Sequence, residues 1–154
     1  MFCVFDNVID IQKCAELISL APDINKIETI MPLTPKWDDR VININQHPIV
    51  EYVEAFLSNT LKQHFKAYNT ELQLWPPEAQ SPMHVHNSPF RLKNGTQRNS
   101  MLYLNNDFEG GEFTTDDIIV IPKPGRLTLF NGSNVRHGVN KVLKKPRFTI
   151  IFWW

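Results

Sequence analysis

Hydrophobic residues recur at two different spacings along the chain, and the change falls near residue 70. Before it, two segments follow the spacing of a helix: one begins after Asp10, which can cap a helix, and a longer one runs from Pro48 to Phe65. Proline suits the first helical position because its missing N–H needs no partner there. Short strands are predicted at Phe2–Phe5, near Ile27–Ile30 and at Val41–Ile44.

After residue 70 the pattern changes to short apolar runs separated by turn residues such as Pro76-Pro77 and Gly110-Gly111. Strands are predicted at Glu71–Trp75, Met83–His86, Arg98–Asn105, Gly111–Thr115, Ile118–Ile121, Arg126–Phe130, His137–Val142 and Arg147–Trp153. Short strands at this spacing indicate a sandwich or barrel, with the early helices packed on one sheet. We therefore expect an α+β, mainly β, single domain over 1–154, with a helical support region at 1–70 and a β core at 71–154.

Composition narrows the class of protein. The 154 residues, 42% of them hydrophobic, suffice for one globular core. The formal net charge is zero, which gives no sign of nucleic-acid or membrane binding, although the second part of the chain is mildly basic. No signal peptide and no membrane span is evident, so a cytoplasmic location is expected. Cys3 and Cys14 are expected to be small buried residues rather than a disulfide.

Three histidines are candidate metal ligands. His84 and His86 are one residue apart, so in a strand both side chains point to the same face. A later strand can bring His137 to them as a third imidazole. Imidazole binds iron, zinc, copper and nickel, so the three histidines do not choose the metal. Hydrogen-bonded structural histidines are the other interpretation, which we also apply to His47 and His64.

Arg147 opens the last apolar strand, a short hairpin beyond His137. Its guanidinium offers a two-pronged donor for a carboxylate, which suggests a dicarboxylate co-substrate reaching from the metal to the arginine. Thr149 shares the strand face of Arg147 and can add a hydroxyl donor. Trp153 lies on the same face, where it either lines the pocket or packs in the core.

The ordered set of motifs resembles the 2-oxoglutarate/Fe(II)-dependent oxygenases, closest to the prolyl 4-hydroxylase type. The segments that carry the resemblance are Met101–Asn105, Phe108–Phe113, Pro122–Gly125, Leu129-Phe130, His137–Val139 and Arg147. The resemblance implies a double-stranded β-helix (a jelly-roll, cupin-like fold) that uses Fe(II) with 2-oxoglutarate as co-substrate; ascorbate is a further candidate cofactor. It also implies that Tyr103, with Thr149, helps Arg147 to bind the far carboxylate.

His86 departs from that family, which holds iron by a His-x-Asp/Glu…His triad. His84 and His137 match the two histidines, and His86 stands where the acid is expected. Three explanations are open. The leading one is a site in which all three histidines bind the metal. In the second, the carboxylate of Asp107 or Glu112 reaches the metal. In the third, His86 does not bind, and one position on the metal stays open.

The predicted function is a 2-oxoglutarate- and Fe(II)-dependent dioxygenase that hydroxylates a peptidyl side chain or a small metabolite, with peptidyl proline favoured by analogy. The alternative is a non-catalytic or differently metallated cupin-like binding protein, because His86 replaces the acidic ligand. A nucleic-acid demethylase is disfavoured by the neutral charge. We expect a monomer or homodimer, with no nucleic-acid or membrane partner. The polar loop 87–97 is either a recognition loop or a solvated turn.

Overall fold

The computed structural model describes residues 1–23, 40–86 and 98–154. The strand predicted near Ile27–Ile30 and the loop 87–97 lie outside the described residues. The helices are α1 (Ile11–Ile18) and α2 (Pro48–Leu61). The strands are β1 (Phe2–Phe5), β2 (Val41–Asn43), β3 (Asn69–Trp75), β4 (Ser81–His84), β5 (Arg98–Tyr103), β6 (Glu109–Gly110), β7 (Phe113–Thr115), β8 (Ile119–Val120), β9 (Leu127–Asn131), β10 (His137–Val139), β11 (Val142–Leu143) and β12 (Arg147–Trp153).

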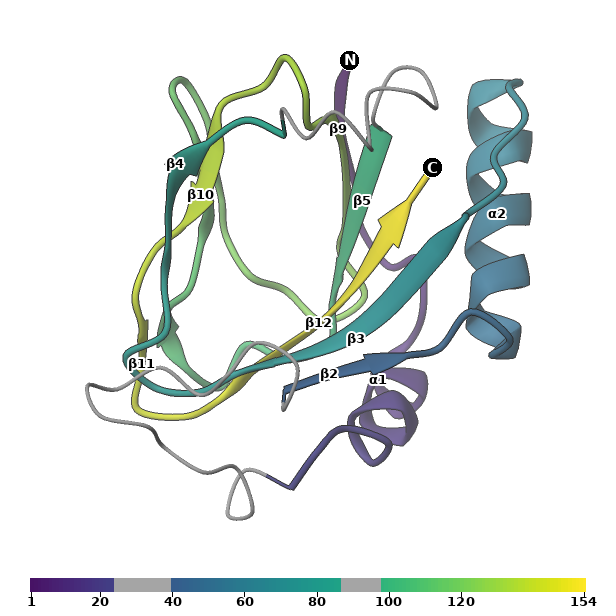
Figure 1. The fold of residues 1–154 in the computed structure, drawn as a ribbon. Coiled ribbons are helices and arrows are strands. Elements are labelled where there is room, and N and C mark those ends of the chain that lie inside the picture. The colour runs from purple at the N-terminus through teal and green to yellow at the C-terminus, as the bar shows by residue number, and fades with distance from the viewer. Residues whose placement is uncertain (24–39, 87–97) are drawn as a thin grey trace.

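The strands form two main antiparallel sheets that face each other. The larger has the order β1-β9-β5-β12-β3-β2 and the smaller the order β4-β10-β7-β8, while β6 and β11 form a separate pair. Figure 1 shows the two sheets across from each other, with both helices on the outer side of the larger one. This arrangement agrees with the predicted mainly β fold, in which helices pack on one sheet of a double-stranded β-helix.

Side chains alternate across the larger sheet, so its strands contribute to hydrophobic cores on both of its faces. In β5, Leu102 joins the outer core with the helices, whereas Met101 and Tyr103 join the inner core with residues of the smaller sheet. The last strand, β12, alternates in the same way: Ile150 lies in the outer core and Arg147 lines the space between the sheets. The inner face of the larger sheet is thus available for a binding site.

Both helices begin at the predicted residues. The side chains of Asp10 and His47 accept backbone hydrogen bonds of 2.8 and 3.1 Å at the first turns of α1 and α2, respectively. The structural interpretation of His47 is therefore confirmed. The longer helix ends at Leu61, short of the predicted Phe65, because Lys62 adopts a left-handed conformation (φ 53°). Phe65 still packs in the outer core.

Two strand predictions differ from the structure around the histidines. The predicted strand Met83–His86 extends too far, since β4 ends at His84 and the backbone N–H of His86 donates to the carbonyl of Gly132 at 2.8 Å. The predicted strand His137–Val142 is two strands, because β11 leaves the smaller sheet to pair with the unpredicted strand β6. The chain therefore turns away from the smaller sheet soon after His137.

The described residues contain no disulfide and no helix long and apolar enough to span a membrane. Cys3 and Cys14 are free thiols. Cys14 is buried as predicted, whereas the prediction for Cys3 is wrong, because Cys3 is only partly buried against the outer core. Burial raises the pKa of the Cys14 thiol.

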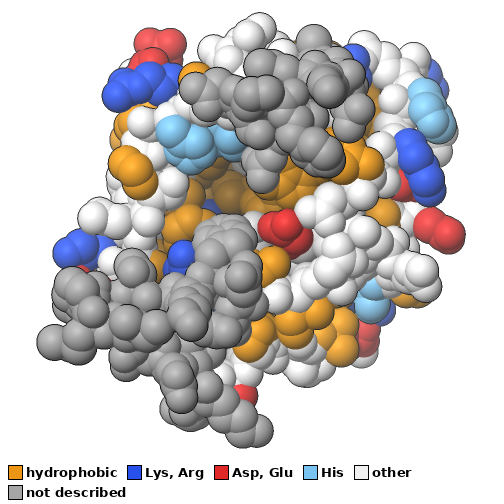
Figure 2. All heavy atoms as spheres, viewed as in Figure 1, with side chains coloured by type: hydrophobic (Ala, Val, Ile, Leu, Met, Phe, Trp, Pro, Cys, Tyr) orange, Lys and Arg blue, Asp and Glu red, His pale blue; other side chains and the backbone are white. Residues whose placement is uncertain are grey.

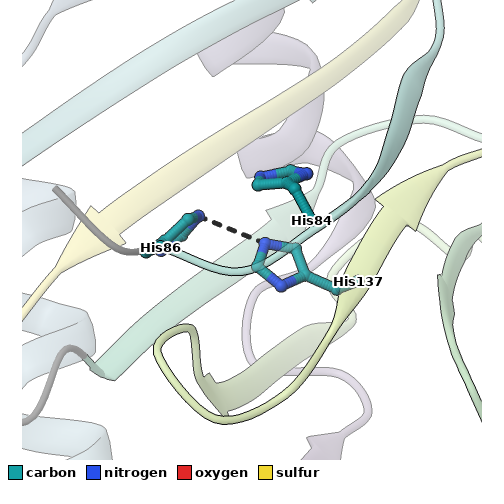
Figure 3. A group of neighbouring side chains, drawn as sticks. All are labelled: His84, His86 and His137. Atoms are coloured by element: carbon teal, nitrogen blue, oxygen red, sulfur yellow. Dashed lines mark hydrogen bonds between the residues drawn. The ribbon is translucent and has the colours of Figure 1, made fainter.

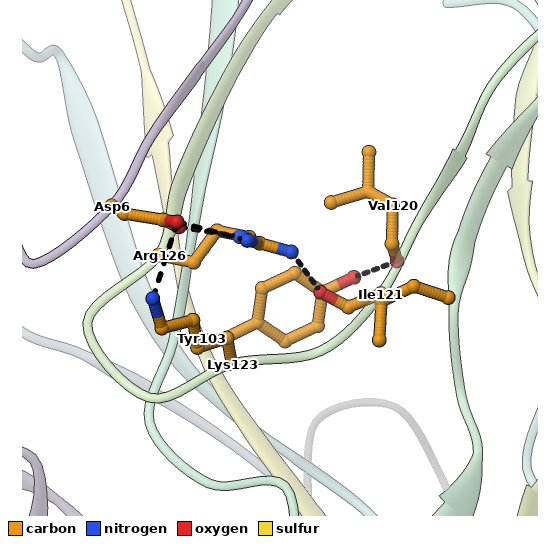
Figure 4. A network of polar contacts seen from close by, with 6 residues as sticks. All are labelled: Asp6, Tyr103, Val120, Ile121, Lys123 and Arg126. Atoms are coloured by element: carbon orange, nitrogen blue, oxygen red, sulfur yellow. Dashed lines mark hydrogen bonds and ion pairs between the residues drawn. The ribbon is translucent and has the colours of Figure 1, made fainter.

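Ionic contacts fasten the N-terminal strand to the loop before β9 (Figure 4). Asp6 lies directly after β1, and its carboxylate accepts three hydrogen bonds. Arg126 donates through Nε at 2.7 Å and through Nη2 at 3.0 Å, and Lys123 donates through Nζ at 3.2 Å. The hydrogen bond from Arg126, supported by Lys123, lowers the pKa of Asp6 from 3.8 to about 2. Arg126 also donates to the carbonyl of Ile121 at 2.8 Å. One carboxylate thus joins β1 to the chain that enters β9, its partner strand.

Candidate metal centre and carboxylate site

Strand pairing brings three histidines together in the smaller sheet. His84 of β4 lies directly opposite His137 of β10. His86 follows β4, and its ring centroid lies 5.4 Å from that of His84 and 4.7 Å from that of His137 (Figure 3). One potential ligand nitrogen from each residue lies within 4.8 Å of the other two. Among the described residues, this is the only such cluster of histidine, cysteine or acidic side chains.

One ring nitrogen of each histidine faces an oxygen that can only accept a hydrogen bond. The three contacts run from Nδ1 of His84 to the Pro82 carbonyl (2.8 Å), from Nδ1 of His137 to the Val135 carbonyl (2.7 Å) and from Nδ1 of His86 to Oδ1 of Asn99 (3.0 Å). Such oxygens carry no hydrogen, so each Nδ1 is the protonated nitrogen and each Nε2 keeps its lone pair. All three imidazoles therefore have the tautomer that binds a metal through Nε2.

Two of these lone pairs face each other. Nε2 of His86 lies 3.2 Å from Nε2 of His137. Two nitrogens that bind one metal through bonds of ~2.1 Å lie roughly 3.0–3.4 Å apart. The donor set and this spacing fit a divalent first-row metal such as Fe(II), which the Nε2 atoms of these two residues and of His84 would hold.

Burial and ring contacts hold the histidines in position. His137 is only 5% exposed and packs against the rings of Phe113 and Phe130, at centroid distances of 5.4 and 4.7 Å. Burial lowers the pKa of His137, which favours the neutral form that a metal ligand needs. His86 packs on Trp153 of β12 at 5.1 Å. The smaller sheet and the end of β12 therefore enclose the histidine cluster together.

The acids proposed as substitutes for a carboxylate ligand are engaged elsewhere. Asp107 pairs with Lys145 at 3.1 Å, and Glu112 accepts a hydrogen bond from Asn140 at 3.0 Å. Neither carboxylate belongs to the histidine cluster. The geometry therefore favours His86 itself as the third ligand.

Arg147, at the opposite end of β12 from Trp153, is fully buried without an acidic partner among the described residues. Its Cζ lies 5.3 Å from the ring of Trp75 and 5.1 Å from that of Tyr103. Its Nη1 donates to the hydroxyl of Thr149 at 3.5 Å, and its Nε has no hydrogen-bond partner. Burial lowers the pKa of Arg147, because a buried charge without a counter-ion is costly. An incoming carboxylate would offset that cost.

The hydroxyl of Tyr103 is bound by the protein itself. It accepts the backbone N–H of Phe113 at 3.1 Å. It also donates to the carbonyl of Val120 at 3.5 Å (Figure 4). Burial raises the pKa of Tyr103, and the nearby Arg147 opposes that rise. The ring therefore supports the guanidinium by stacking. Direct contacts of Tyr103 and Thr149 with a co-substrate stay predictions.

A cavity of about 400 Å³ connects the two ends of this site. Figure 2 shows a hollow lined mainly by hydrophobic side chains, with histidine on its rim. The three histidines and Arg147 all border it. The apolar part of its wall includes Trp75, Met101, Phe113, Phe130, Ile151 and Trp153. A mostly apolar space with few polar groups is typical of a small-molecule site.

A comparison with protein families identifies the chain. Residues 63–154, more than half of its length, match the family model of the 2OG-Fe(II) oxygenase superfamily. The chain belongs to the 2OG-Fe(II) oxygenase superfamily. This oxygenase family uses Fe(II) and 2-oxoglutarate, and the histidine cluster and the buried arginine fit these two groups.

Comparisons with individual proteins agree with the oxygenase fold. The 2-oxoglutarate complex of a viral collagen prolyl hydroxylase from Paramecium bursaria Chlorella virus-1 has a TM-score of 0.73 at 14% identity, covering 99% of this chain and 93% of that one. A Trichoplax adhaerens prolyl hydroxylase in complex with a hypoxia inducible factor peptide has a TM-score of 0.64 at 15% identity, covering 99% and 82%. Human prolyl 3-hydroxylase 2 is 36% identical over 63 residues, which cover 36% of this chain and only 9% of that protein.

Two residues beside the candidate metal ligands were not predicted from the sequence. Asn99 orients His86, and its only signal is a polar side chain within the apolar strand β5. Gly132, predicted only as a turn residue, lies so close to these two that a Cβ would come within 2.2 Å of His86 Nδ1. Both roles depend on contacts between segments that are far apart in the chain.

Proposed function

We propose that residues 1–154 act as one oxygenase domain that hydroxylates an organic substrate. The reaction converts 2-oxoglutarate and dioxygen into succinate and carbon dioxide, and inserts one oxygen atom into a substrate C–H bond. One observation carries the proposal: a single cavity has three imidazole lone pairs at one end and a buried guanidinium without a counter-charge at the other. Fe(II), when bound, supplies the redox chemistry with dioxygen.

The side chains have separate tasks in this proposal. His84, His86 and His137 hold the metal through Nε2. Arg147 binds the far carboxylate of 2-oxoglutarate by charge-assisted hydrogen bonds, which are stronger than neutral ones. Trp75 holds the guanidinium plane in position by stacking, and the apolar cavity wall excludes water from the reacting groups.

We further propose a peptidyl substrate, with proline favoured. Support comes from the human relative, which is named a prolyl 3-hydroxylase, and from fold neighbours named prolyl hydroxylases, one of them in complex with a peptide. A small metabolite is the second candidate. The cytoplasmic location and the monomer or homodimer state stay predictions.

The test is succinate formation. Protein loaded anaerobically with Fe(II) and 2-oxoglutarate is exposed to air, first alone and then with proline-containing peptides. We expect wild type to release succinate, and His84→Ala and His137→Ala to lose both bound iron and turnover. His64→Ala is the matched control, because His64 is exposed and outside the cluster, and it should behave as wild type.

Two outcomes would contradict parts of the proposal. Iron binding without any succinate, across peptides and small metabolites, would favour the alternative of a cupin-like binding protein. If His86→Ala keeps full iron content and turnover, His86 is not a required ligand, and the metal is held by the other two histidines with an open position.

A further inference from the structure

Glu71 is the only acidic side chain among the described residues that line the cavity. It lies on the inner face of β3 with Gln73 and Trp75, because side chains two apart in a strand share a face. Glu71 is paired across the sheet with Ile151, and Trp75 with Arg147. Along the sheet, Glu71 therefore lies between Arg147 at one end of the cavity and the histidine cluster, which packs on Trp153, at the other. Figure 2 shows an acidic group at the rim of the hollow.

A ladder of hydrogen bonds holds the Glu71 carboxylate from both sides. Asn69 Nδ2 donates to one oxygen at 2.8 Å, and Gln73 Nε2 donates to the other at 3.0 Å. The orientation of the Gln73 amide is fixed, because its oxygen accepts the indole N–H of Trp75 at 3.1 Å and a flipped amide would lose this hydrogen bond. Both carboxylate oxygens of Glu71 therefore accept a hydrogen bond from a neighbouring side chain on the same strand. The anion is thus fixed in place at the cavity.

No lysine or arginine of the described residues forms an ion pair with Glu71. Each carboxylate oxygen accepts one hydrogen bond from the ladder and can accept another. Gln73 beside it is 3% exposed, whereas Glu71 itself is half-buried. A half-buried anion beside apolar walls attracts a cation more strongly than one in bulk water.

We propose that Glu71 receives a cationic group of the substrate, an ammonium or a guanidinium, near the histidine end of the cavity. The inference rests on the proposed oxygenase function, in which Arg147 is occupied by 2-oxoglutarate and cannot serve the substrate. Glu71 then remains as the acidic side chain of the cavity. The nearby ring of Trp153 can add cation–π attraction. A substrate with a negative charge at that point would be rejected by repulsion, so Glu71 contributes to specificity in both directions.

A binding experiment without turnover tests this role directly. Protein loaded with Zn(II) and 2-oxoglutarate is titrated with Nα-acetyl-lysinamide and with its neutral counterpart Nα-acetyl-norleucinamide, and the tryptophan indole N–H resonances are followed by NMR. We expect the lysine compound to bind about tenfold more tightly, which is the size of one charge-assisted hydrogen bond at a partly buried site. Raising the salt concentration should weaken only the lysine compound.

Variants separate recognition from a purely structural ladder. Glu71→Gln should bind both compounds equally, and Glu71→Asp should keep the preference for lysine. Glu51→Gln removes an exposed carboxylate on α2 and is the matched charge control, so it should keep the wild-type preference. Thermal unfolding of each variant monitors the fold, since Glu71→Gln places an amide against two donors.

The proposal is overturned if wild type binds the two compounds equally, if neither binds, or if Glu71→Gln retains the lysine preference. The salt series uses wild type alone and decides the question even if Glu71→Gln is unstable. Because the zinc-loaded protein does not turn over, this result is independent of succinate formation. Failure of the oxygenase reaction and failure of cation recognition are therefore distinguishable.

Discussion

Asn99 determines which nitrogen of His86 is available to a metal. Its Oδ1 lies 3.0 Å from Nδ1 of His86 and keeps the proton on that nitrogen, so that Nε2 faces His137. Backbone carbonyls perform the same task for the other two histidines, and no substitution removes a carbonyl. His86 is therefore the one candidate ligand of the three whose orientation depends on a side chain. Such partners of metal-binding histidines commonly change metal affinity by 10- to 100-fold.

We expect Asn99→Leu to lower the affinity for Fe(II) or Zn(II) roughly 10- to 100-fold, because His86 loses the acceptor that selects its tautomer. Asn99→Asp should keep the affinity near wild type, since its carboxylate oxygen accepts the same hydrogen bond. Metal titration against a competing chelator measures both. Equal metal affinity of Asn99→Leu and wild type would show that His86 needs no such partner.

Arg147 makes a different prediction, because it concerns the co-substrate and not the metal. Arg147→Gln should weaken 2-oxoglutarate binding roughly 10- to 100-fold, as expected for losing charged hydrogen bonds worth ~1.5–3 kcal/mol. Zn(II) affinity should stay unchanged. The unliganded variant should be no less stable than wild type, since the change removes a buried charge without a counter-ion.

Calorimetric titration of zinc-loaded protein with 2-oxoglutarate, beside a zinc titration, measures these effects. Arg136→Gln is the control, because Arg136 pairs with Asp116 on the surface. Parallel losses of zinc and 2-oxoglutarate affinity in Arg147→Gln would indicate damage to the fold and would argue against the assigned role.

At the scale of elements, the contact between β1 and the loop before β9 joins the N-terminal region to the larger sheet. β1 is the edge strand next to β9, and Asp6 follows it directly. Arg126 lies directly before β9 and presents two nitrogens to that carboxylate, which is the strongest geometry for such a pair. The pair is partly exposed, so its contribution to stability is smaller than the change in pKa alone suggests.

Asp6→Asn should lower the free energy of unfolding by about 1 kcal/mol at neutral pH, the upper end for an exposed pair. The pKa of Asp6 is lowered from 3.8 to about 2 in the folded protein. A lowered pKa means that the stabilisation is complete above pH 3.8 and is lost as the pH falls through about 2. Urea unfolding of both proteins across this range measures the difference.

Glu16→Gln serves as the comparison for Asp6→Asn, since it removes an exposed pair with Lys13 within one helix. Its effect should be smaller. A constant difference between wild type and Asp6→Asn down to pH 1 would contradict the assigned linkage.

At the scale of the whole molecule, local patterns predict the sheets but not the positions of all groups between them. Alternation along β12 correctly places Arg147 on an inner face, because side-chain direction follows from the strand alone. Asn99 reaches His86 only because β5 and β12 pair in a register that places Asn99 opposite Trp153. The sequence of neither strand alone determines that register. The end of β4 at His84 depends likewise on a distant contact with Gly132.

Ligands bound at the two ends of the cavity should stabilise the folded protein one after the other. A ligand at 100 times its dissociation constant stabilises the folded state by ~2.7 kcal/mol. For a chain of this length that corresponds to a rise of roughly 5–10 °C in Tm. We expect Zn(II) to produce one such rise, and 2-oxoglutarate a second one that requires the metal, because the co-substrate spans both ends.

Thermal unfolding of three variants assigns each rise to its end of the cavity. His137→Ala should lose both rises, and Arg147→Gln should keep the first and lose the second. His64→Ala should keep both, as an exposed histidine outside the cluster. If 2-oxoglutarate stabilises the metal-free protein as much as the zinc-loaded one, it binds at Arg147 alone. The histidine cluster and the arginine would then be two separate sites instead of one.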